Sequence, residues 1–116
     1  MALYVPTSVL GELSAICFEG KKHSVDDLYK IIDLLNRCDV KFRHPNRVVA
    51  EICCNLYSDA WRDDRMKPTD LVHLGYALAY EVDYFITSDR ILNAYRIPEE
   101  FKLKVLTPDV AIKQFL

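Results

Sequence analysis

The residue best placed for chemistry is Asp89, which follows a short apolar run across two hydroxyl residues, Thr87 and Ser88. The run Tyr84–Ile86 predicts a strand covered on both faces, as in a parallel sheet between helices. Ligands of open α/β sheets bind beyond the carboxyl ends of the strands, so Asp89 would lie at such a site.

Two further acids belong to predicted helices. Asp70 opens the helix that leads directly into the strand before Asp89, and Glu12 lies one turn into a helix near the N-terminus. Taken singly, each acid has an ordinary structural role: Asp70 complements a helix dipole, Glu12 faces solvent, and Asp89 caps a helix. Placed together at one edge of a sheet, carboxylates supply the oxygen ligands that hard divalent cations prefer.

The composition indicates one globular domain over residues 1–116, with 51% hydrophobic and 28% charged residues. The formal net charge of −2 argues against a surface coated in positive charge for nonspecific nucleic-acid binding, so any nucleic-acid site must be local. The apolar runs are too short for a membrane span, and no signal peptide is evident. We expect a cytoplasmic protein.

The four cysteines, Cys17, Cys38, Cys53 and Cys54, show no Cys-x-x-Cys pairing and lie within apolar helical patterns. This placement predicts buried, reduced thiols rather than zinc ligands or disulfides. None of the histidines is assigned to catalysis. His73 is expected to pack on its helix, whereas His23 and His44 are expected in loops.

Strands and helices alternate along the chain. Ser24 is a predicted N-cap, Thr69 caps a helix opened by Pro68, and Thr107 caps the last helix. The expected strands are 2–5, 40–42, 83–87 and 104–107, and the expected helices are 9–20, 24–38, 46–64, 69–80, 89–95 and one from 108. This alternation predicts an α/β fold with three α/β/α layers and a short, mainly parallel sheet.

The stretch "PTDLVHLGYALAYEVDYFITSDRIL" resembles the C-terminal signature of PIN domains, in which an acid opens an apolar helix and a strand ends in Thr-x-Asp. "YVPTSVLGEL" is similar to the family segment in which a strand and a proline lead to a helix carrying a glutamate. The resemblance implies a Mg²⁺- or Mn²⁺-dependent ribonuclease, common as the toxin of toxin–antitoxin pairs. Glu12, Asp70 and Asp89 match three metal-binding acids of the family, and Thr87 matches its hydroxyl residue.

The fourth family acid, an aspartate that ends the first strand, has no counterpart here, so the chain is expected to be incomplete at its N-terminus relative to the family. In a rival register Pro6 stands in place of that aspartate and Glu51 serves as the glutamate. Glu51 leaves too little chain before Asp70 for the intervening helices, which favours Glu12. The alternative function is a catalytically impaired PIN-like module that acts through protein–protein contact.

Other side chains have secondary roles in this interpretation. Arg90 could reach an RNA phosphate, and Asn93 lies near where some relatives place another polar ligand. Tyr76, Tyr80 and Trp61 are expected in the core or an interface. The resemblance also implies RNA and an antitoxin protein as partners. The missing strand predicts a homodimer, with Tyr29, Tyr57 and Trp61 as candidate contacts. The alternative is that the strand 2–5 closes up against 84–87 within the chain.

Overall fold

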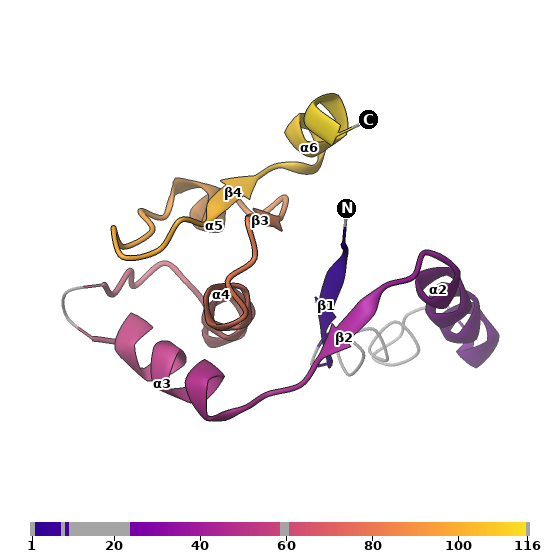
Figure 1. Cartoon of the computed structure of the whole chain (residues 1–116), viewed down its shortest axis with the longest axis horizontal. Helices are drawn as coiled ribbons and strands as arrows, with labels where there is room; N and C mark the ends of the chain where they lie inside the picture. The colour runs from indigo at the N-terminus through magenta and orange to yellow at the C-terminus, as the bar shows by residue number, and fades with distance from the viewer. Residues whose placement is uncertain (1, 8, 10–23, 59–60, 116) are drawn as a thin grey trace. The chain divides into compact units, whose positions relative to one another are not determined.

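The computed structural model describes residues 2–7, 9, 24–58 and 61–115, which form a mixed α/β structure (Figure 1). The chain divides into two compact units, Met1–Pro45 (unit 1) and Asn46–Leu116 (unit 2). Each unit holds one pair of parallel strands, and a helix lies in the connection between the paired strands. Parallel pairing requires such a crossover, so the predicted α/β class and parallel strands are confirmed.

In unit 1, strand β1 (Tyr4–Pro6) pairs with β2 (Lys41–Arg43). The Lys41 backbone N–H donates to the Leu3 carbonyl at 2.9 Å. The Arg43 guanidinium lies 4.4 Å from the centre of the Tyr4 ring, a cation–π contact across the pair. The residue just before the expected second strand, Asp39, has a φ of 54°, which explains why that strand begins one residue later than predicted.

Helix α2 (Val25–Arg37) confirms the predicted N-cap. The Ser24 backbone N–H donates to the Asp27 carboxylate at 3.1 Å, and the Asp27 N–H donates to the Ser24 hydroxyl at 3.3 Å. This reciprocal pair satisfies two N–H groups that the helix itself cannot bond. The predicted apolar face is half-buried, and no residue of α2 is fully buried in the described part of the chain. It consists of Leu28, Ile31, Ile32 and Leu35.

Unit 2 begins with α3 (Arg47–Leu56), which packs against α4 (Pro68–Ala79). The Asn46 side chain joins the two helices, because its oxygen accepts from the Val49 N–H at 2.9 Å while its amide donates to the Tyr80 hydroxyl at 3.2 Å. Gly75 permits the close approach of the helices: a Cβ at this position would overlap the Cys53 sulfur.

Helix α3 is shorter than the predicted helix 46–64, which was wrong beyond Leu56. The described residues after it form turns, stabilised by the Trp61 and Arg62 N–H groups, which both donate to the Ser58 carbonyl. The Asp63 carboxylate then accepts the Arg65 backbone N–H at 3.0 Å. Side-chain bonds to nearby backbone groups compete with helix continuation in this way.

Helix α4 differs from its prediction at its start and at one residue of its predicted buried face. The N-cap is Lys67, which makes no side-chain cap bond, with Pro68 at the first helical position, so the expected Thr69 cap is wrong. Val72 is 37% exposed, although Leu71 and Leu74 are buried. Val72 is displaced by about 100° around the helix from Leu71, which takes it off the buried stripe.

Helices α2 and α4 end in the same backbone motif. After α4, Glu81 has a φ of 53°, its N–H donates to the Leu78 carbonyl, and the Val82 N–H donates to the Ala77 carbonyl, each at 3.2 Å. After α2, the N–H groups of Asp39 and Val40 make the equivalent bonds. Both are Schellman motifs, in which glycine usually occupies the left-handed position.

Strand β3 (Tyr84–Ile86) pairs with β4 (Lys104–Leu106), with α5 (Arg90–Ala94) between them and α6 (Pro108–Phe115) after them. The predicted opening of α6 is confirmed, because the Thr107 hydroxyl accepts the Val110 N–H at 3.3 Å ahead of Pro108. The expected cover on both faces of β3 is wrong at Ile86, which is 45% exposed at the end of a strand in a two-stranded sheet.

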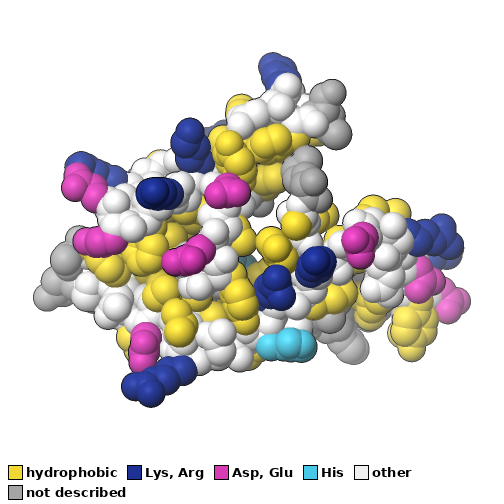
Figure 2. Space-filling model, in the orientation of Figure 1, with side chains coloured by type: hydrophobic (Ala, Val, Ile, Leu, Met, Phe, Trp, Pro, Cys, Tyr) yellow, Lys and Arg dark blue, Asp and Glu magenta, His cyan; other side chains and the backbone are white. Residues whose placement is uncertain are grey.

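The apolar core of the described residues lies in unit 2, around Leu56 and Leu74, which have no exposed surface. Leu71, Leu78, Leu92 and Leu103 belong to the same cluster, and Trp61, Phe85 and Phe101 pack against it. Tyr76 is buried and Tyr80 half-buried, as predicted for core aromatic residues. Apolar side chains also reach the surface, as Figure 2 shows.

The described cysteines are free thiols, as predicted, but their predicted burial is wrong for Cys38 and Cys54, which are exposed. Cys54 lies next to Cys53 on α3, so only one of the two can face α4. Cys17 lies outside the described residues. Among the described helices, none has the length and hydrophobicity needed to cross a bilayer.

Candidate functional site

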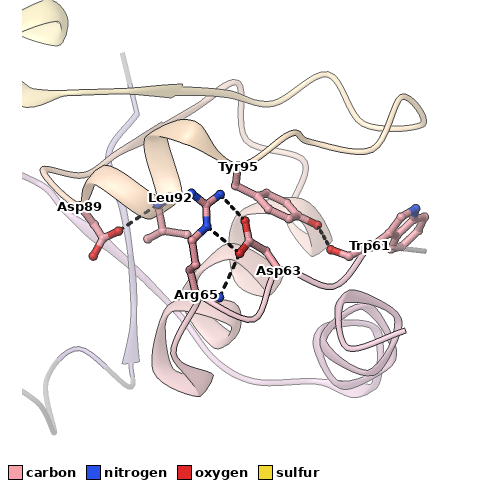
Figure 3. A network of polar contacts seen from close by, with 6 residues as sticks. All are labelled: Trp61, Asp63, Arg65, Asp89, Leu92 and Tyr95. Carbon is pink, nitrogen blue, oxygen red and sulfur yellow. Dashed lines mark hydrogen bonds and ion pairs between the residues drawn. The ribbon is translucent and has the colours of Figure 1, made fainter. Parts of the chain in front are cut away.

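The turn after β3 holds Asp89 in a fixed conformation at the N-cap of α5. Its Oδ1 accepts the Leu92 N–H at 2.9 Å (Figure 3). Its own N–H donates to the Thr87 hydroxyl at 3.1 Å. The Asn93 amide donates to the carbonyls of Thr87 and Asp89, both at 2.8 Å. Thr87, Asp89 and Asn93 therefore form one hydrogen-bonded turn at the carboxyl end of β3.

This turn leaves acceptor oxygens available for a ligand. One carboxylate oxygen of Asp89 is engaged by the cap, and among the described residues nothing donates to the other, which points away from Leu92 in Figure 3. The Asn93 side chain uses its NH₂ group for both backbone bonds, so its carbonyl oxygen also stays open within the described part of the chain. Carboxylate and amide oxygens suit a hard divalent cation.

Asp70 lies in the first turn of α4 and is half-buried. Within the described ranges its carboxylate makes no hydrogen bond or ion pair, and nothing of either kind links it with Asp89 or Thr87. Both acids follow the expected order along the chain, one at the start of the helix and one after the strand. Their convergence on one cleft stays a prediction.

Glu12, the third predicted acid, lies outside the described residues. Among residues 2–7, 9, 24–58 and 61–115, no group of three or more His, Cys, Asp or Glu side chains could hold a metal ion. The donor chemistry of Asp70 and Asp89 fits Mg²⁺ or Mn²⁺. The described residues do not assemble a complete set of ligands.

The remaining residues considered from the sequence are Arg90, Glu51 and the histidines. Arg90 is exposed at the start of α5. Glu51, the glutamate of the rival register, lies on the exposed side of α3 and pairs with Arg47 at 2.7 Å. His73 is half-buried on α4 and His44 is exposed in the segment after β2, while His23 lies outside the described residues.

A polar cluster that was not predicted lies in the turn before α4. The carboxylate of Asp63 accepts the side chain of Arg65 at 3.0 and 2.8 Å and its backbone N–H at 3.0 Å (Figure 3). These bonds, the side-chain bond foremost, lower the pKa of Asp63 to about 2. Close by, the Tyr95 hydroxyl donates to the Trp61 carbonyl at 2.8 Å, and burial together with the Asp63 charge raises the pKa of Tyr95.

The signal for this cluster was present in the stretch "DDR" at 63–65, where an acid two residues before an arginine is typical of a side-chain-stabilised turn. The cluster borders an open cavity of about 470 Å³, which Trp61, Asp63 and Tyr95 help to line. Both oxygens of the Asp63 carboxylate already accept hydrogen bonds from Arg65. We therefore assign this cluster to the structure of the turn.

No family model, curated protein or solved structure matches this chain.

Proposed function

We propose that the chain is a PIN-like, divalent-cation-dependent ribonuclease that hydrolyses RNA phosphodiesters, with Asp70, Asp89 and Glu12 as metal ligands and a three-layer arrangement of its helices and strands. The observation that carries the proposal is the turn at Thr87–Asp89, where a parallel strand ends in a half-buried carboxylate with one oxygen open among the described residues. An acid in this place suits a site beyond the carboxyl end of a sheet.

Each residue of the turn has a separate task. The Thr87 hydroxyl accepts a hydrogen bond from the Asp89 N–H. The Asn93 side chain is fixed because its NH₂ group donates to the carbonyls of Thr87 and Asp89. The Asp89 side chain is therefore fixed before any ligand arrives, which lowers the cost of binding. When bound, a divalent cation supplies a more acidic water and neutralises charge on the phosphate.

The test compares Mn²⁺ affinity and RNA cleavage in the wild type and Asp89→Asn. Asparagine caps helices as well as aspartate does, so the fold should persist while the ligand charge is lost. We expect affinity and cleavage to fall together, by about tenfold or more. Asp64→Asn, which removes an exposed acid paired with Arg62 at 2.6 Å, is the matched control. Cleavage that persists in Asp89→Asn or in excess chelator rejects the mechanism.

A metal ion shared by Asp70 and Asp89 should also be detectable in the Mn²⁺ affinity of a double variant. If Asp70 and Asp89 hold the same cation, the loss of Mn²⁺ affinity in the double variant Asp70→Asn/Asp89→Asn should be much smaller than the sum of the single losses. Additive losses would show that the two acids act separately and would contradict the common site.

A second proposal is a PIN-like module that acts through protein contact, either with an antitoxin protein or with a second copy. The observation that favours it is the exposure of large apolar side chains on α2 and directly after α3. Of the proposed dimer contacts, Tyr29 and Tyr57 are 59% and 46% exposed, whereas Trp61 packs edge-on against Phe101 with ring centres 6.0 Å apart. Absence of carboxylate-dependent Mn²⁺ binding would favour this module over the enzyme.

A further inference from the structure

A cavity of about 330 Å³ opens in unit 2 beside the segments that lead into β3 and β4. Val82 and Asp83 precede β3, and Lys102 and Leu103 precede β4, so the cavity lies at the amino ends of this strand pair. The Thr87–Asp89 turn follows the carboxyl end of β3, about 10 Å away along a three-residue strand. The cavity is therefore separate from the proposed metal site.

The floor of this cavity is apolar. Leu78 and Leu103 belong to the buried core, and Val82 and Phe101 pack against that core while keeping part of their surface exposed. The volume is near the lower end of the roughly 300–1,000 Å³ range of ligand pockets, which leaves room for a short segment around one apolar side chain and excludes a large ligand.

The rim of the cavity carries three exposed acids, Glu81, Asp83 and Glu100, and one base, Lys102. In the described part of the chain none of these four side chains has an ion-pair partner. Elsewhere in unit 2 three exposed acids are neutralised by arginine: Glu51, Asp64 and Glu99 pair with Arg47, Arg62 and Arg96. The rim therefore carries three carboxylates against one ammonium group, and its net charge is negative.

We propose that this cavity, lined by Val82 and Phe101 and rimmed by Glu81, Asp83 and Glu100, binds a basic segment of a partner protein, in which one apolar side chain flanked by lysine or arginine enters the cavity. The apolar floor receives the central side chain, and the three carboxylates face the flanking cations. Such charge complementarity governs the rate and specificity of encounter. This inference is independent of the proposed ribonuclease.

The probe is an acetylated pentapeptide with a central leucine between two pairs of lysines, titrated into the full chain while backbone amide NMR shifts are followed. We expect the largest shifts at Val82, Asp83 and Lys102, and weaker binding at high salt. A peptide with serine in place of leucine, or with glutamate in place of lysine, should bind more weakly.

The decisive variant is Glu81→Gln/Asp83→Asn/Glu100→Gln, whose dissociation constant for the pentapeptide should be about tenfold larger than that of the wild type. The control, Glu51→Gln/Asp64→Asn/Glu99→Gln, changes the net charge equally but spares the cavity, and should bind within about twofold of the wild type. Asp89→Asn should bind unchanged, which separates this proposal from the metal site.

Three results would overturn the proposal. Equal weakening in both triple variants would mean that the peptide responds only to net charge. Peptide-induced shifts centred away from Val82 and Asp83 would place the binding elsewhere. Shifts at these amides that depend on protein concentration without any peptide would mean that a second copy of the chain occupies the cavity.

Discussion

The carboxylate of Asp63 is held by three hydrogen bonds, all of which come from Arg65. This arrangement stabilises the charged form and lowers the pKa of Asp63 from its ordinary value of 3.8 to about 2. As pH falls, the unfolded chain takes up this proton first. The stabilisation is therefore complete above about pH 4 and is lost as the pH falls towards 2.

We predict that the free energy of unfolding of the wild type exceeds that of Asp63→Asn above pH 4, and that this difference shrinks between pH 4 and pH 2. Urea unfolding at a series of pH values measures it. Arg65→Gln should show the same loss of pH dependence, because the shift depends on its hydrogen bonds. A difference that stays constant over this range would contradict the prediction.

At the scale of elements, the contact of α3 with α4 depends on Gly75. A methyl group there would overlap the Cys53 sulfur, and the next neighbour, the Val49 carbonyl, would lie at 3.7 Å. Burial raises the pKa of the Cys53 thiol, and the adjacent Cys54 adds to this, so the thiol is a neutral packing group. The overlap would involve the Cys53 sulfur alone, because the next two atoms would lie at 3.7 and 3.8 Å, which are ordinary contact distances.

We predict that Gly75→Ala lowers the free energy of unfolding by about 1–2 kcal/mol, because overpacking outweighs the better helix propensity of alanine. In the Cys53→Ala background the same substitution should be neutral or stabilising. A double-mutant cycle by urea unfolding should therefore give a coupling energy of about 1 kcal/mol or more. Additive effects would mean that the sulfur moves aside without cost.

Glu81 is held in a left-handed conformation at the end of α4, where only glycine avoids steric cost. Glu81→Gly should therefore be more stable than Glu81→Ala by about 1 kcal/mol, since both variants lose the carboxylate and only one keeps a Cβ. Thermal unfolding of the two proteins measures this difference. Equal stability would show that the conformation is free of strain.

Helix starts were predictable from the sequence where local chemistry decides them. Ser24 and Thr107 cap their helices as expected because each bond is made within three residues. The end of α3 was not predictable, since the pattern around Trp61 fits a helix, whereas the turn bonds of Ser58 and Asp63 in the described chain end it. The left-handed residues Asp39 and Glu81 lack the glycine that usually marks such positions.

The candidate site was predictable in part for a related reason. Asp89 was expected both as a possible helix cap and as a ligand, and the structure shows the cap directly because it is a local bond. A metal site at Asp70 and Asp89 depends on how segments distant in the chain pack. That information is carried by tertiary contacts, which a single sequence does not reveal.

On the scale of the whole molecule, the two units differ in burial. All fully buried apolar side chains of the described residues, from Val49 to Ala111, belong to unit 2. Helix α2 has a good cap yet exposes Val25, Tyr29 and Leu34 by more than half. Local stability follows the number of buried apolar contacts, so the units should open with different free energies.

We predict that the amides of α4 from Leu74 to Leu78 exchange with solvent at least about a hundredfold more slowly than those of α2 from Ile31 to Leu34. Hydrogen exchange followed by mass spectrometry or NMR on the full chain measures both segments together. Comparable protection of the two helices would show instead that they unfold as one cooperative unit.

The contact between Gly75 and Cys53 also restricts the order in which these positions can evolve. Alanine at 75 is destabilising while the sulfur at 53 is present, whereas loss of that sulfur needs no earlier change at 75. Once the sulfur has gone, a Cβ at 75 would lie 3.8 Å from the Cβ of residue 53, an ordinary contact distance. Of the two routes to the double variant, one passes through a destabilised intermediate. Descendants of this chain should therefore lose Cys53 before they lose Gly75.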